Sequence, residues 1–130
     1  MIDVHAALLA FLEAELSGVK IYAGRSEPPV GYRLTGGDCI VFRARGGGPD
    51  YDDALLMPSV QFKCYGTAAN NESSELASFT LYRSLYDALH NGHDGSILHA
   101  QSETLGQLLN EPDTGWYYVL AHFQIMVRQS

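Results

Sequence analysis

The sequence is poor in cysteine and in basic residues, and both shortages narrow the possible functions. It holds two cysteines, Cys39 and Cys64, and neither belongs to a CxxC pair. A short secreted chain that depends on disulfides normally carries more cysteines, so we expect both thiols to be reduced and the protein to be cytosolic. Eight basic residues stand against fifteen acidic ones, which gives a formal net charge of −7. This balance repels polyphosphate and argues against tight wrapping around DNA or RNA.

A long uninterrupted apolar run is also missing. The N-terminal stretch MIDVHAALLAFLEAEL contains Asp3, Glu13 and Glu15 and has no basic leader. We therefore expect neither a signal peptide nor a membrane span there. The chain has 130 residues, of which 46% are hydrophobic and 11% aromatic. This composition predicts a single folded domain, residues 1–130, with a substantial core.

Two segments have the apolar spacing of amphipathic helices. The first begins after Asp3, a suitable N-cap, and stops at Gly18. Its expected apolar stripe is Val4, Leu8, Phe11, Leu12 and Leu16. The second is capped by Asn70 or Asn71 and ends at Asn91. Its expected apolar stripe is Leu76, Phe79, Tyr82, Leu85, Tyr86 and Leu89.

Alternating apolar and polar residues predict the strands. We expect strands at residues 19–24, 38–45, 59–65, 97–104 and 116–129, with a long loop over residues 25–37. Pro58, at the start of the third strand, suggests an edge position or a bulge. The order α-β-β-β-α-β-β predicts an α+β fold, with an antiparallel (possibly mixed) sheet and two main helices packed on one face.

The last strand has two unequal faces. One face is wholly apolar and should meet the helices: Tyr117, Val119, Ala121, Phe123, Ile125 and Val127. The opposite face mixes apolar residues, namely Trp116, Tyr118, Leu120 and Met126, with His122, Gln124 and Arg128. A sheet covered on one side should show water a polar second face, so this half-apolar face predicts a cover. A neighbouring subunit and a loop of the same chain are equally suitable covers.

The stretch FRARGGGPDYDDAL, residues 42–55, raises the question of a phosphate-binding loop. A Walker loop needs a lysine and a serine or threonine after its glycines, followed by a helix. Here acidic residues follow the glycines and the chain continues into a strand. The chain also has no GxGxxG motif. The run therefore indicates the tip of a β-hairpin.

No motif for catalysis is present. His90, His93 and His99 are the candidates for a metal site, but they fall on a helix end, a turn and a strand, and we interpret them as solvated histidines. Neither cysteine is tied by sequence to a base, GxSxG is absent, and the adjacent Asp52 and Asp53 would point to opposite faces of a strand. We expect no catalytic, cofactor-binding or metal-binding residues, and no enzyme activity.

The layout of the chain resembles the tail-terminator (tail-completion) proteins of long-tailed bacteriophages and phage-like particles. The resemblance rests on the opening helix DVHAALLAFLEAEL, on VKIYAG before a proline-bearing loop, on VQFKCYGTAANNESSELASFTLYRSLYDAL, and on the closing strand WYYVLAHFQIMV. It spans nearly all of the chain, although no single motif in it is diagnostic.

The resemblance implies a structural virion protein that is made in the host cytoplasm and works at the neck of the tail. Such subunits form a homo-oligomeric ring, expected to be a hexamer, on the last ring of the tail-tube protein. The ring ends tube polymerisation and joins the tail to the head–tail connector. DNA passes through its pore without specific binding, which suits a net charge of −7. The family implies no catalytic residue, no cofactor and no membrane.

Two other classes of function stay open at this point. One is another neck or head-completion subunit of a phage, and the other is a small cytosolic enzyme or ligand-binding domain. As candidates for the subunit interface we name Arg43, Arg45, Asp50, Asp52 and Asp53 in the hairpin, and Trp116, Tyr118, Leu120 and Met126 on the last strand. The hairpin charges could pair with the next subunit around a ring or across the hairpin itself.

Overall fold

The computed structural model describes residues 4–29, 37–46, 55–56, 58–67, 74–91, 97–111 and 116–128. Its elements are α1 (Val4–Glu15), β1 (Lys20–Ala23), β2 (Cys39–Gly46), β3 (Leu55–Leu56), β4 (Ser59–Tyr65), α2 (Ser74–Asn91), β5 (Ile97–Asn110) and β6 (Tyr117–Arg128). The predicted α+β class and order of elements are confirmed, with the two-residue strand β3 as an addition. The three charges expected at the hairpin tip, Asp50, Asp52 and Asp53, lie outside the described residues.

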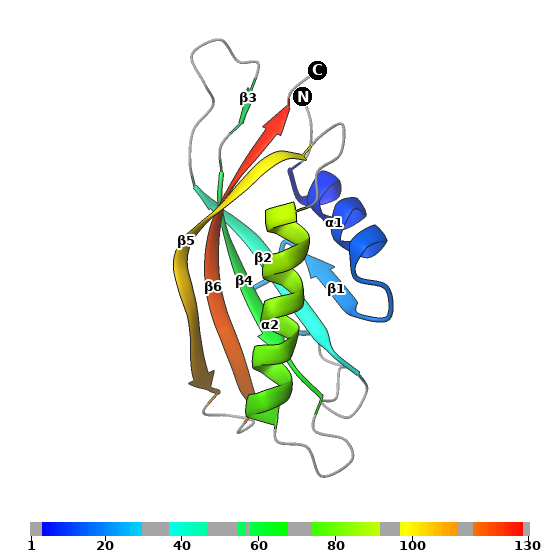
Figure 1. Ribbon diagram of the computed structural model, residues 1–130, viewed down its shortest axis with the longest axis vertical. Helices are drawn as coiled ribbons and strands as arrows, with labels where there is room; N and C mark the ends of the chain where they lie inside the picture. The colour runs from blue at the N-terminus through cyan, green and yellow to red at the C-terminus, as the bar shows by residue number, and fades with distance from the viewer. Residues whose placement is uncertain are drawn as a thin grey trace.

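All six strands belong to one sheet. The order β1-β2-β4-β6 is extended on the far side of β6 by β5, while β3 pairs with the C-terminal end of β6. Every pairing is antiparallel except that of β1 with β2, which is parallel. Figure 1 shows β1 and β5 at opposite sides of the sheet. The possibility of a mixed sheet, left open by the sequence, is thereby realised.

Both helices cover the same face of the sheet, as the sequence predicts (Figure 1). The larger core cluster lies between them and the sheet and takes residues from α1, α2, β2, β4, β5 and β6. Alternation in the strands accounts for this core, because residues two apart point to the same side. The residues of β6 that meet the helices are Val119, Ala121, Phe123, Ile125 and Val127, all buried as expected, while Tyr117 at the strand's start is half-buried.

The first helix follows its predicted pattern. Leu8, Phe11 and Leu12 are buried, and Val4 and Leu16 pack against the core from the two ends of the helix. Gly18 follows with a φ of 85°, a left-handed conformation that glycine adopts without strain. The expected stop of the helix is thus confirmed.

The second helix follows its predicted apolar stripe over its C-terminal part but departs from it at its start. Leu76 and Phe79 were expected in the core, yet they are 60% and 36% exposed. Leu85 and Leu89 are buried and Tyr82 and Tyr86 pack against the core, as predicted, while Ala77, Ser78 and Leu81 are buried in addition. Small residues face the sheet at the start of α2 because the chain at Gly66 comes so close that a Cβ there would overlap the main chain of the helix. The two large side chains are left outside.

Two predictions about the strands need correction. The strand expected at residues 97–104 continues to Asn110. The sequence pattern did not reveal its second half, because register shifts between Ser102 and Thr104 and between Thr104 and Gln107 interrupt the alternation of side chains. Pro58 does not mark an edge strand, since β4 lies between β2 and β6. The bulge that Pro58 also suggested is present: the register of β2 shifts between Ala44 and Gly46, opposite the first residue of β4.

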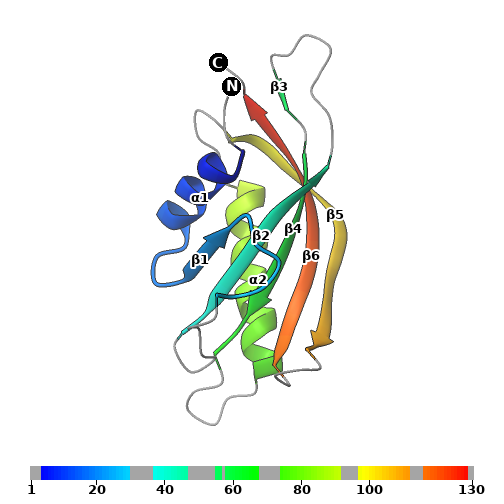
Figure 2. The ribbon, with the colours of Figure 1, turned by 180° about the vertical axis from the view of Figure 1, so that it is seen from behind.

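The parallel pairing of β1 and β2 requires the chain to return to the starting end of β1 before β2 begins. Residues 24–38 make this return, and the described parts of that stretch, 24–29 and 37–38, contain no helix. Figure 2 shows the stretch that follows β1 crossing the sheet on the side away from the helices. A segment of the chain itself therefore runs over part of the face for which the sequence predicts a cover.

Candidate functional site: the helix-free face of the sheet

The sheet surface opposite the two helices is called here the helix-free face. The register aligns its side chains in rows that cross the strands. Its residues are Cys39, Val41 and Arg43 of β2; Ser59, Gln61, Lys63 and Tyr65 of β4; Trp116 just before β6; Tyr118, Leu120, His122, Gln124 and Met126 of β6; and Gln101, Thr104, Gln107 and Leu109 of β5. One end of the face is aromatic and apolar, and the other end is polar.

The aromatic end is a second, smaller core. Cys39, Val41 and Tyr65 are buried, and Tyr22, Trp116 and Tyr118 pack against them. The Tyr65 ring meets Tyr118 at 5.2 Å between ring centroids and meets Trp116 edge to face at 6.4 Å. Such aromatic pairs add roughly 0.5–1.5 kcal/mol beyond the area they bury. The chain thus covers this end of the face with its own aromatic residues.

Polar groups surround the aromatic end. The Tyr65 hydroxyl donates to a carboxylate oxygen of Glu111 at 3.4 Å. The Lys63 ammonium lies 5.1 Å from the centroid of the Tyr118 ring, which is within the range of a cation–π contact. A hydrogen bond thus orients the Tyr65 hydroxyl, while ring and cation–π contacts hold the Tyr118 ring.

Burial governs the ionisation of the groups at this end. It raises the pKa of the Cys39 thiol to about 12, and the ammonium of Lys20 opposes that rise only in part. It also raises the pKa of the Tyr65 and Tyr118 hydroxyls, and the carboxylate of Glu111 adds to both shifts. All three groups are neutral near pH 7. A buried, protonated thiol is a poor nucleophile, so the arrangement does not activate Cys39.

The remaining apolar residues of the face are only partly covered. Leu120 and Met126 are half-buried, like Trp116 and Tyr118. These four are the candidates that the sequence placed on β6, and all four lie on the helix-free face. Whether they contact another subunit stays a prediction. Among the hairpin candidates, Arg43 is exposed on the same face, whereas the side chain of Arg45 lies outside the described residues.

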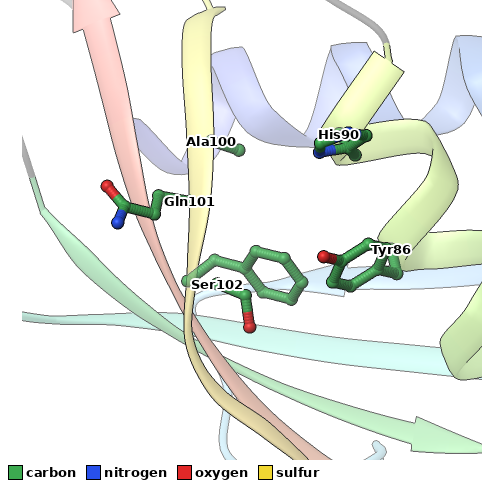
Figure 3. Close-up of a pocket in the computed structure, with 6 residues that line it drawn as sticks. Tyr86, His90, Ala100, Gln101 and Ser102 are labelled. Atoms are coloured by element: carbon green, nitrogen blue, oxygen red, sulfur yellow. The ribbon is translucent and has the colours of Figure 1, made fainter.

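The helix side of the sheet carries a small cavity of about 240 Å³ between α2 and β5. Tyr86, His90, Ala100, Gln101, Ser102 and Phe123 line it. In Figure 3, His90 lies above Tyr86, with which it stacks at 5.8 Å between ring centroids, and Gln101 points away from both rings. Of the three histidines considered for a metal site, His90 alone contributes a described side chain here.

The described residues offer no further chemistry. His93 lies outside them, as does the side chain of His99. Within the described ranges, no group of three or more His, Cys, Asp or Glu side chains could hold a metal ion. In the same part of the chain, no helix is long and apolar enough to cross a membrane.

Sequence reasoning missed the buried members of the aromatic end. The sequence pattern gives no sign that Tyr65 is buried, because Gln61 and Lys63, which share its side of β4, are polar. The register that brings Tyr65 between Cys39 and Tyr118 joins three segments that are distant in sequence. The one local signal is the run of aromatics from Trp116 to Tyr118, which indicates an apolar surface on both sides of β6.

Comparisons with known proteins do not add to this description of the site. No protein-family model matches the chain, and no curated protein sequence matches it.

Proposed function

We propose that this chain is a structural subunit of a long-tailed bacteriophage or phage-like particle. Copies of the subunit form a ring, expected to be a hexamer, that caps the tail tube and ends its polymerisation. The ring joins the tail to the head–tail connector, and DNA passes through its pore. The partners are therefore other copies of the chain, the tail-tube protein and the connector.

The observation that carries the proposal is the uneven cover of the sheet. Both helices lie on one side, while the other side keeps Trp116, Tyr118, Leu120 and Met126 half-buried in one row along β6. Apolar side chains gathered on one face of a small domain are typical of a protein–protein contact. A net charge of −7 supports a pore past which DNA moves without binding.

Ring formation is the first test. Native mass spectrometry of the purified chain should show a hexamer, alone or after addition of assembled tail tubes. A chain that stays monomeric at every concentration, both alone and with tubes, would overturn the proposal.

Tube capping is the second test and uses a matched pair of variants. Purified tube protein is allowed to polymerise, and tube lengths are measured by electron microscopy. Added wild-type chain should shorten the tubes and give them a uniform end. Leu120→Glu places a charge on the helix-free face and should abolish capping. Thr80→Glu places the same charge on the exposed side of α2 and should leave capping unchanged. If both variants change tube length equally, the helix-free face is not the surface that caps the tube.

A further inference from the structure

The two outer strands of the sheet differ in length and in charge. β5 has fourteen residues and pairs, among the described strands, with β6 alone. It contains no lysine, arginine or proline, the residues that commonly protect an exposed strand edge from pairing. At the other side of the sheet, β1 pairs with β2 alone among the described strands and has four residues. Figure 1 shows both edges at the outside of the molecule.

The residues near the two edges differ in the sign of their charges. The β1 edge carries Lys20 and, just after the strand, Arg25, with no acidic residue from 19 to 26. Glu103 lies in β5 and Glu111 follows it, with no lysine or arginine from 97 to 111. Their carboxylates lie over the helix-free face, where they accept from the Ser59 hydroxyl at 2.6 Å and the Tyr65 hydroxyl at 3.4 Å. Opposite charges on two surfaces of one molecule favour head-to-tail association of copies. The strand directions agree, because successive pairings place β1 antiparallel to β5.

We infer that the β1 edge of one copy pairs with the β5 edge of the next, so that the sheet continues from subunit to subunit. This inference rests on the proposed ring and names its lateral contact. The joint uses the main chain at the sides of the sheet. It leaves the helix-free face available to a protein stacked on the ring, such as the last ring of the tube.

The main chain points to a particular register. The Lys20 N–H donates to the Asp38 carbonyl, so Lys20 faces β2 and the polar groups of Ile21 face outward. On β5, the Glu111 N–H donates to the Trp116 carbonyl of the β6 side. Alternation then turns the N–H and C=O of Leu108 outward. Ile21 opposite Leu108 can therefore form two main-chain hydrogen bonds across the joint.

Side chains agree with this register. Ile21 and Leu108 are partly buried apolar residues on the helix side of the sheet. The register also sets Lys20 opposite Leu109 on the helix-free face, with Glu111 as the diagonal neighbour of Lys20. A shift of two residues would set Ile21 opposite Gly106, whose N–H already donates to the Tyr82 hydroxyl at 3.1 Å. The pairing of Ile21 with Leu108 is therefore favoured over that with Gly106.

Disulfide trapping tests the register. Lys20 and Leu109 would form a non-hydrogen-bonded pair with Cα atoms about 4.5 Å apart, a spacing that a disulfide can bridge. The variant carrying Lys20→Cys and Leu109→Cys should, on mild oxidation, give a ladder of covalent oligomers on a non-reducing gel, and reductant should abolish the ladder. All cysteine variants also carry Cys39→Ala, because Cys39 is the neighbour of Lys20 in the pairing of β1 with β2 and would compete for a cysteine at position 20. Cys64 is buried and should not cross-link.

The controls separate this inference from the proposed ring. Lys20→Cys with Gln101→Cys uses an exposed residue of the same strand, out of register, and should give no ladder. Leu109→Cys alone should also give none. Covalent dimers from it would indicate a symmetric β5–β5 contact and overturn the head-to-tail pairing. If the wild type forms a ring and the double variant also assembles but gives no ladder, the edge pairing is wrong and the proposed ring stands. If the wild type is a monomer, both the edge pairing and the ring are wrong.

Hydrogen–deuterium exchange of the unmodified chain provides a second reading if the cysteine variant fails to fold. The amides of Ile21 and Leu108 should exchange more slowly in the ring than in the dissociated subunit. Amides of exposed residues in α2, such as that of Arg83, should not change between the two states. Equal exchange at Ile21 and Leu108 in both states would overturn the inference.

Discussion

Ser78 is the buried polar side chain of the described core, and its removal should destabilise the fold measurably. Its hydroxyl oxygen accepts the Gly66 N–H at 2.9 Å and donates to the Tyr117 carbonyl at 3.3 Å. One side chain of α2 thereby connects the residue after β4 to the first residue of β6. The substitution Ser78→Ala leaves the buried Gly66 N–H without this partner.

The size of the loss follows from the geometry. The space vacated by one hydroxyl oxygen is too small for a water molecule to replace it. A buried N–H left without a partner costs about 1–3 kcal/mol. For a chain of 130 residues, this corresponds to a fall in Tm of about 4–11 °C. The loss is a substantial part of the roughly 5–15 kcal/mol that stabilises a typical domain.

Urea unfolding, followed by circular dichroism, measures this loss directly. The midpoint should fall for Ser78→Ala while the slope of free energy against urea stays that of the wild type. Ser84→Ala is the matched control, because Ser84 is an exposed residue of the same helix whose hydroxyl donates only to the Thr80 carbonyl at 3.2 Å. Its stability should change by no more than about 0.5 kcal/mol. If the two variants unfold at the same urea concentration, the hydrogen bonds of the Ser78 hydroxyl do not stabilise the fold and the prediction is refuted.

Three further predictions concern close packing and buried thiols. Gly66→Ala should lower the urea midpoint more than Gly106→Ala, because the added methyl meets rigid helix main chain at Gly66 and mostly side chains at Gly106, including the Tyr82 ring at 2.7 Å. Cys39 and Cys64 should not react with a thiol reagent in the native state and should both react in urea, so fast labelling without denaturant would contradict their burial. Because burial raises the pKa of Cys39 from 9.0 to about 12, its contribution to stability is complete below pH 9 and is lost as the pH rises toward 12. The urea midpoint should therefore fall between pH 9 and 12, and Cys39→Ala should reduce that fall.

Local patterns predicted the inner faces of the strands well. Alternation in residues 117–127 identified the side chains of β6 that meet the helices, because strand side chains alternate regardless of what the strand pairs with. The first helix was predicted for a similar reason, since its apolar stripe and Gly18 are local signals. The second helix shows the limit. Its large residues Leu76 and Phe79 suggested a buried stripe, but the close approach of Gly66 placed Ala77 and Ser78 against the sheet.

The sequence predicted only some of the apolar residues of the helix-free face. Trp116, Tyr118, Leu120 and Met126 were identified because β6 is apolar on both sides. Tyr65, which lies at the centre of the aromatic end, was not identified, because its surroundings come from the register of strands and not from its neighbours in sequence. The same holds for the two edges, since strand order decides which residues stand at an edge.

The sequence by itself determined the class of fold, the inner faces of the main strands, the reduced state expected of two isolated cysteines, and the absence of recognisable catalytic motifs. These features depend on residue type and on spacing over a few residues. Tertiary structure alone decided that β1 joins β2 in parallel, that residues after β1 cross the helix-free side, and that β5 and β1 form the two edges of the sheet. Such features depend on pairings between residues far apart in the chain, for which no short pattern carries a signal.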